Sequence, residues 1–219
     1  MFKYIFEFSD KESKEFTVHV DKNEQPEDEP TSLPDWTVLS YKQCSNCPLT
    51  ESEHCPVAKD IYKIVHTFSD VTSFEKVDVR VIGAAREYRK KCDAQTGLNS
   101  LLGLVMASSN CPILSRLKPM ARFHLPFCSS DEVLIRTLSF YLMKQLFNYK
   151  EGDDCDMELH GLIKSYDELI VLNTCFAERI RNSVTQDANL NAITKFFAVS
   201  VLVPFSLKDC LANVRPLVL

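Results

Sequence analysis

The stretch "KYIFEFSDKESKEFTVHV" (3–20) decides how the fold begins. Its two ends, residues 3–8 and 15–20, are rich in aromatic and β-branched side chains, which favour extended strands. The polar segment "SDKESK" between them is suited to a turn. The sequence therefore predicts a β-hairpin at the start of the chain.

Two further strands and one helix are expected before residue 93. After an acidic, proline-bounded connector, "WTVLSY" (36–41) is strand-like, and "KVDVRVIGAAREY" (76–88) shows the two-residue period of a half-buried strand. Between them, "PVAKDIYKIVHTF" (56–68) predicts a helix with Pro56 at its first position, where a missing N–H costs nothing. Its apolar face consists of Val57, Ile61, Ile64, Val65 and Phe68.

The second half of the chain has the apolar spacing of helices. "TGLNSLLGLVMASS" (96–109) is apolar almost all round, which indicates a central buried helix. A second helix, 129–149, opens with a capping box formed by Ser129 and Glu132. Further helices are expected at 157–182, at 188–203 with Asp187 as the cap, and from Ser206.

Strands that precede helices, rather than alternating with them, favour an α+β fold over a parallel doubly wound sheet. We expect a small antiparallel sheet of about four strands with one helix (1–92), packed on a C-terminal helical bundle (93–219). The two parts are expected to form one compact unit, since 219 residues suit one domain.

Composition and charge exclude several classes of function. The net charge of −5 provides no general attraction to nucleic acid, and the basic cluster "REYRKK" (86–91) is interpreted as a solvated strand end. No export signal is visible, and the longest apolar runs, 101–107 and 196–205, are shorter than the roughly 20 residues of a membrane span. No glycine-rich phosphate loop is present. These features predict a cytoplasmic protein.

Nine cysteines in such a chain are expected to be reduced thiols, available for packing, metal binding or chemistry. Cys44 and Cys47 form a C-x-x-C, a spacing that lets two thiolates bind one metal ion. Cys-Pro occurs at 47–48, 55–56 and 111–112, more often than this composition produces by chance. Because Cys55 and Cys111 each precede a proline that can start a helix, their thiolates would be favoured by the helix N-terminal field.

These observations predict a metal site made of Cys44, Cys47, Cys55 and Cys111. Zinc is favoured, because zinc sites are the commoner use of small cytosolic cysteine sets, and it would be structural, since four thiolates leave no open position for a substrate. An iron–sulfur cluster is the alternative, because Pro48 after a ligand cysteine is typical of ferredoxin motifs. Two other readings stay open, a reactive thiol at Cys55 or Cys111, and buried packing cysteines at a sheet–helix junction.

The sequence contains no complete catalytic set, so a non-enzymatic interaction or regulatory protein is favoured over an enzyme. The alternative is a redox protein that uses the cluster or the reactive thiol. An unknown protein partner would fit the first function, and the apolar helices could support a homodimer.

The motifs "QCSNCPL", "HCPVAKDI", "TGLNSLLGLVMASSNCP", "LKPMARFHLPF" and "DANLNAI" resemble those of a bacterial family of domains of unknown function, over nearly the full length. This resemblance implies no activity. It places the four site cysteines in motif positions, together with Arg122 and His124, whereas Cys92 and Cys128 fall outside the pattern. Arg122 and His124 are expected either to form a second shell or anion site, or to hold an irregular connection in place.

Overall fold

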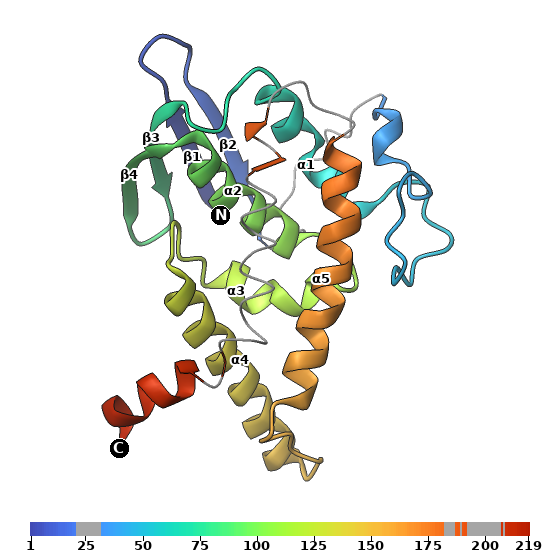
Figure 1. Ribbon diagram of the computed structural model, residues 1–219, viewed down its shortest axis with the longest axis vertical. Coiled ribbons are helices and arrows are strands. Elements are labelled where there is room, and N and C mark those ends of the chain that lie inside the picture. The colour runs from blue at the N-terminus through green and yellow to red at the C-terminus, as the bar shows by residue number, and fades with distance from the viewer. Residues whose placement is uncertain (21–31, 182–186, 189, 192–206, 208) are drawn as a thin grey trace.

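The computed structural model describes residues 1–20, 32–181, 187–188, 190–191, 207 and 209–219 (Figure 1). Its strands are β1 (Phe2–Glu7), β2 (Lys14–Val18), β3 (Lys76–Ile82) and β4 (Glu87–Asp93). Its α-helices are α1 (Pro56–Thr67), α2 (Ala94–Ser108), α3 (Lys118–Arg122), α4 (Ser130–Glu151) and α5 (His160–Arg181). Two short 3₁₀ helices are η2 (Asp35–Thr37) and η3 (Leu114–Leu117).

The strands form one four-stranded antiparallel sheet in the order β2-β1-β3-β4. Together with the helices that follow, this arrangement confirms the α+β class. The hairpin expected at 3–20 is present as β1 and β2. In contrast, the single strand expected at 76–88 is two strands, β3 and β4, joined by a tight turn in which the Gly83 N–H donates to the Arg86 carbonyl.

One face of the sheet packs into the core, and β3 shows a regular alternation of buried and partly buried residues. Tyr4, Phe6 and Val79 point into the core and are fully buried. Helix α2 comes so close to this face that a Cβ on Gly97 would lie 2.7 Å from the Phe6 ring and 2.8 Å from Val79. Buried residues from the sheet and from α1, α2, α4 and α5 belong to one continuous core.

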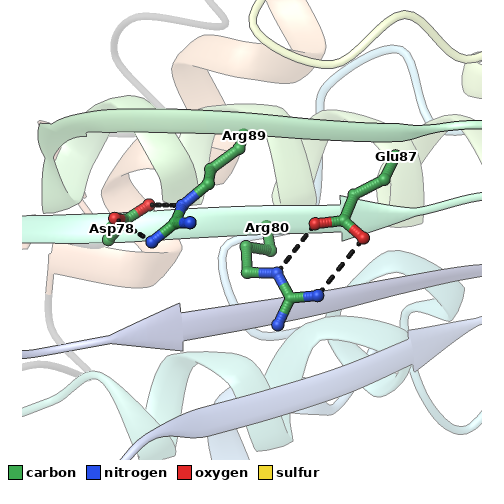
Figure 2. A network of polar contacts seen from close by, with 4 residues as sticks. All are labelled: Asp78, Arg80, Glu87 and Arg89. Carbon is green, nitrogen blue, oxygen red and sulfur yellow. Dashed lines mark hydrogen bonds and ion pairs between the residues drawn. The ribbon is translucent and has the colours of Figure 1, made fainter.

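The opposite face of the sheet carries two cross-strand ion pairs between β3 and β4 (Figure 2). Arg80 and Arg89 lie directly opposite each other on β3 and β4, which alone would be repulsive. Each guanidinium instead binds a carboxylate diagonally across the strands: Arg80 Nε lies 2.8 Å from Glu87, and Arg89 Nη2 lies 2.8 Å from Asp78. These hydrogen bonds lower the pKa of both carboxyl groups. This face is therefore charged and locally balanced.

The helices agree closely with the periodicity of the sequence. Helix α1 starts at Pro56, and its residues Val57, Ile61, Ile64 and Val65 are buried, as is Phe68 just beyond it. The capping box of α4 is formed by Ser129 and Glu132 as predicted. Most of the helix expected at 188–203 lies outside the described residues, and residues 209–218 are helical. Within the described part of the chain, no helix has the length and hydropathy to cross a bilayer.

Candidate functional site

Residues 36–41 do not form the strand that was expected there. The structure has η2 followed by one isolated bridge, Val38 to His54. The reason is that Arg179 of α5 takes the carbonyl groups a partner strand would use, donating to Trp36 at 2.6 Å, to Val38 at 2.8 Å and to Leu39 at 3.1 Å. The segment is thus held by a helix side chain.

This bridge closes a loop, residues 40–52, that carries the C-x-x-C. The Leu39 N–H donates to Glu53 and the Cys55 N–H donates to Thr37, at 2.9 and 2.8 Å. The Thr37 hydroxyl also lies 2.9 Å from His54 Nδ1. Cys55 therefore lies at the neck of the loop, directly where α1 begins.

The C-x-x-C is a tight turn that rests on α5 (Figure 1). The Cys47 N–H donates to the Cys44 carbonyl at 2.9 Å. Asn46, between the two cysteines, donates through its side chain to the Glu168 carbonyl at 2.9 Å, and Cys44 Sγ lies 3.9 Å from the Leu172 carbonyl. The turn thus has the compact shape on which two thiols can face the same way.

Cys55 and Cys111 come from the two helices beneath this loop. Cys55 is the N-cap residue of α1, ahead of Pro56, as the sequence predicted. Cys111 follows α2 and precedes Pro112, but it is not at a helix N-terminus as expected, because the short 3₁₀ helix η3 begins only at Leu114 with Ile113 as its N-cap. The backbone N–H groups of Leu114 and Ile113 bond to the Cys111 sulfur.

The thiols raise one another's pKa values, which indicates that they lie in the same region of the molecule. Burial, with smaller contributions from the neighbouring thiols of Cys175, Cys55, Cys47 and Cys111, raises the pKa of the Cys44 thiol to about 12. Burial also raises the pKa of Cys111 and outweighs the two N–H bonds that lower it, with Cys55 and Cys47 adding to the increase. The four predicted cysteines therefore share one neighbourhood.

The side chains are not arranged around a common point. Among the described residues, no three His, Cys, Asp or Glu side chains are placed together as the ligands of one metal ion. The structure thus gathers the predicted cysteines without confirming the metal site, which stays a prediction.

Cys175 also lies in this neighbourhood, although its surroundings in the sequence indicate packing alone. It lies on α5, one turn beyond Leu172, and it has the largest effect of any neighbouring thiol on Cys44. Its position in the apolar stripe of a helix resembles that of a core residue, and nothing in its local sequence indicates other thiols nearby. The contact between α5 and loop 40–52 was the missing information.

Arg122 and His124 lie in and just after α3, a short helix where no regular structure was expected. Arg122 ends α3 and is exposed. His124 Nε2 lies 2.6 Å from the Tyr4 hydroxyl, which lies 2.7 Å from Ser100 Oγ. Burial, with a contribution from Arg136, lowers the pKa of His124 to about 3, so its ring is neutral near pH 7. The contacts of His124 thus fasten β1 to the connection after α3, and a second-shell role for either residue stays a prediction.

The remaining cysteines have separate surroundings. Cys92 is on β4, and Cys128 lies near Arg136 at the wall of a small cavity of about 130 Å³. Cys155 is exposed, with its sulfur 3.4 Å from the Gln145 carbonyl, and Cys210 is half-buried in the C-terminal helix.

Comparison with known proteins gives one family and no activity. A search of curated proteins and a search of solved structures each found no match. A family model described as a domain of unknown function, DUF6901, matches residues 2–218. The chain therefore belongs to the DUF6901 family.

Proposed function

We propose that the protein binds a soft metal ion through Cys44, Cys47, Cys55 and Cys111, with zinc as the first choice. The observation that carries the proposal is that a loop on α5, the start of α1 and the end of α2 bring these thiols into one neighbourhood. Thiolates in a C-x-x-C turn with two further cysteines are a donor set that suits zinc.

The chain itself contributes two features to such a site. Loop 40–52 is closed at its neck and anchored on α5, so the C-x-x-C turn is held before any ion arrives. The two N–H groups at Cys111 favour its thiolate form. A bound ion would tie the loop to the two helices and would draw the thiols together, since metal binding requires their deprotonated form.

With four protein thiolates, such a site would be structural and would leave no position for a substrate. We therefore infer a non-enzymatic interaction or regulatory protein, with a partner protein whose identity the chain does not indicate. The metal would keep the loop folded, and the loop would be the part of the molecule that responds to loss of metal.

The experiment is anaerobic purification followed by measurement of zinc, iron and free thiols. We expect about one zinc per chain and protection of the site cysteines from thiol reagents. The Cys44→Ser/Cys47→Ser double variant should lose the zinc. Cys155→Ser is the matched control and should keep it, because Cys155 lies outside the cluster. A wild-type protein without metal, whose site thiols react at the rate of ordinary buried cysteines, would contradict the proposal.

A redox protein is the second candidate, and one observation favours it. N–H groups that bond to a ligand sulfur, as at Cys111, also tune the potentials of iron–sulfur clusters. A brown protein with iron and labile sulfide would identify this function. A reactive thiol is less well supported at Cys44 and Cys111, because burial raises both pKa values and disfavours the nucleophilic thiolate. Cys55 is then the position to test with alkylating reagents.

A further inference from the structure

A second site lies away from the cysteines, in a cleft between α4 and α5. The two helices diverge from their connection at residues 152–159, and η3 and α3 lie across the open end (Figure 1). The cleft between these elements has a volume of about 470 Å³, within the usual range for small-molecule sites.

The rim of the cleft is cationic. Arg116, Lys144 and Lys164 line it, together with one carboxylate, Glu168. Arg116 and Glu168 bind each other at 2.5 Å and so neutralise one another locally. Within the described residues, Lys144 and Lys164 are exposed and form no ion pair. Two ammonium groups from facing helices are therefore free to bind an anion in a protein whose net charge is −5.

The cleft also has a set of apolar and aromatic side chains along its walls, beside polar ones such as Thr137 and Ser165. Its walls are formed by the side chains of Leu117, Met120, Phe140, Leu162, Tyr166 and Leu169. Tyr166, held by a 2.8 Å hydrogen bond between its hydroxyl and that of Thr137, also borders the smaller cavity beside His124. Tyr166, Leu117 and Met120 line both the cleft and this smaller cavity of about 130 Å³, which is close in size to cavities that hold one benzene ring.

We propose that this cleft binds a small organic anion with an apolar body, its anionic group between Lys144 and Lys164 and its apolar part against Leu117, Met120 and Leu169. Neither half of such a ligand is sufficient alone. An inorganic anion leaves the apolar walls in contact with water, and an uncharged apolar molecule leaves the lysines without a partner. The proposal does not depend on the metal site, because no cysteine lines the cleft.

The test uses octanoate as the probe, with octanol and inorganic phosphate as the two comparison compounds, and isothermal titration calorimetry of the full chain. Octanoate should bind with one site per chain, and both comparison compounds should bind at least several-fold more weakly. Equal binding of octanol would overturn the role of the lysines, and equal binding of phosphate would overturn the role of the apolar walls. Absence of octanoate binding would overturn the whole proposal.

Substitutions of the two lysines test whether octanoate binds in this cleft. Lys144→Gln and Lys164→Gln should each weaken octanoate binding about two- to fivefold, the effect expected of one exposed charge pair, and the double variant should weaken it about tenfold. Lys150→Gln, on the same helix but outside the cleft, is the matched control and should leave binding unchanged. Equal losses in all three single variants would show attraction to net charge alone and would overturn the site.

A filling variant tests the cleft without changing charge. Ser165 lines the cleft and is half-buried, so Ser165→Trp should occupy its volume and abolish octanoate binding. Unchanged binding in a folded Ser165→Trp protein would place the ligand elsewhere. Zinc content should be the same in all of these variants, which separates failure of this proposal from failure of the metal proposal.

Discussion

A single buried guanidinium, that of Arg179, organises the entrance to the thiol loop. It is 1% exposed, and it donates to three backbone carbonyl groups that no strand pairs with. The Tyr41 ring lies 5.8 Å from the same group. Hydrogen bonds from a charged donor are stronger than neutral ones. Without the guanidinium, the Trp36 and Leu39 carbonyl groups lose this donor, whereas the Val38 carbonyl still accepts from the Tyr41 N–H at 3.1 Å.

Replacing Arg179 with methionine should keep the packing of the aliphatic stem and remove the three hydrogen bonds. We expect a loss of about 2–4 kcal/mol in the free energy of unfolding, measured by urea denaturation, and faster reaction of the loop thiols with a thiol reagent. Arg181→Met, at the exposed end of the same helix, is the control and should have little effect on either. A loss below about 0.5 kcal/mol for Arg179→Met would contradict this role.

His124 should make stability depend on pH. Burial lowers its pKa to about 3 in the folded protein, whereas the unfolded value is near 6.5. Between these values only the unfolded chain binds the proton, so acid favours unfolding. Stability is retained above pH 6.5 and falls by about 1.4 kcal/mol per pH unit below it, from this group alone.

The measurement is urea denaturation between pH 7 and pH 4.5 of wild type and His124→Gln. Glutamine can still accept a hydrogen bond from Tyr4 and does not titrate, so the variant should show a flatter dependence. His160→Gln, at an exposed histidine on α5, should keep the wild-type slope. Parallel curves for wild type and His124→Gln would show that this ring titrates normally.

At the scale of elements, α2 packs tightly against the sheet. Gly97 lets the helix touch Phe6 and Val79, and a methyl group there would overlap both. Gly97→Ala should therefore destabilise the protein by about 1–3 kcal/mol, although alanine favours a helix by about 1 kcal/mol over glycine.

The companion change Val79→Ala should recover part of that loss, because it makes room for the new methyl group. Thermal and urea unfolding of the two single variants and the double variant form a cycle whose coupling energy reports the contact. Strict additivity of the two losses would show that the helix simply shifts away from the sheet.

The elements that could be predicted from the sequence are those with strong local signals. β1 and β2 have aromatic and β-branched side chains, α1 has a helical apolar face and a leading proline, and α4 has its capping box. Residues 36–41 have the same strand-like composition, but their carbonyl groups bind Arg179, about 140 positions away in the sequence. Local propensity contains no information on such a partner.

The candidate site also combines residues that the sequence could predict with residues that it could not. Cys44, Cys47 and Cys55 could be grouped by spacing, and Cys111 by its repeated Cys-Pro context. Cys175 could not, because only the packing of α5 against loop 40–52 brings it near Cys44. The lysines of the cleft were missed for a related reason, since Lys144 and Lys164 line the same cleft only because of how α4 and α5 are placed in the fold.

At the scale of the whole molecule, one core includes the sheet, α1, α2, α4 and α5, and the thiol neighbourhood borders this core where loop 40–52, α1, α2 and α5 come together. A metal ion bound there should stabilise the entire chain. Zinc that occupies the site at 100 times its dissociation constant would add about 2.7 kcal/mol, or roughly 5–11 °C in the unfolding temperature of a protein of this size.

A strong chelator should therefore lower the unfolding temperature of wild type by that amount, and added zinc should restore it. The metal-free Cys44→Ser/Cys47→Ser variant is the control and should not respond to the chelator. A zinc-containing wild type that unfolds at the same temperature with and without chelator would show that the metal does not tie the parts together.

The edge strand β4 of the sheet also affects self-association of the protein. β4 is an outer strand of the sheet in the described chain, and five of its seven residues are charged: Glu87, Arg89, Lys90, Lys91 and Asp93. An exposed edge strand readily pairs with a strand of a neighbouring molecule, and a row of charged side chains opposes such pairing. Growth of the sheet from one copy to the next, the route to fibres, is thus blocked on this side.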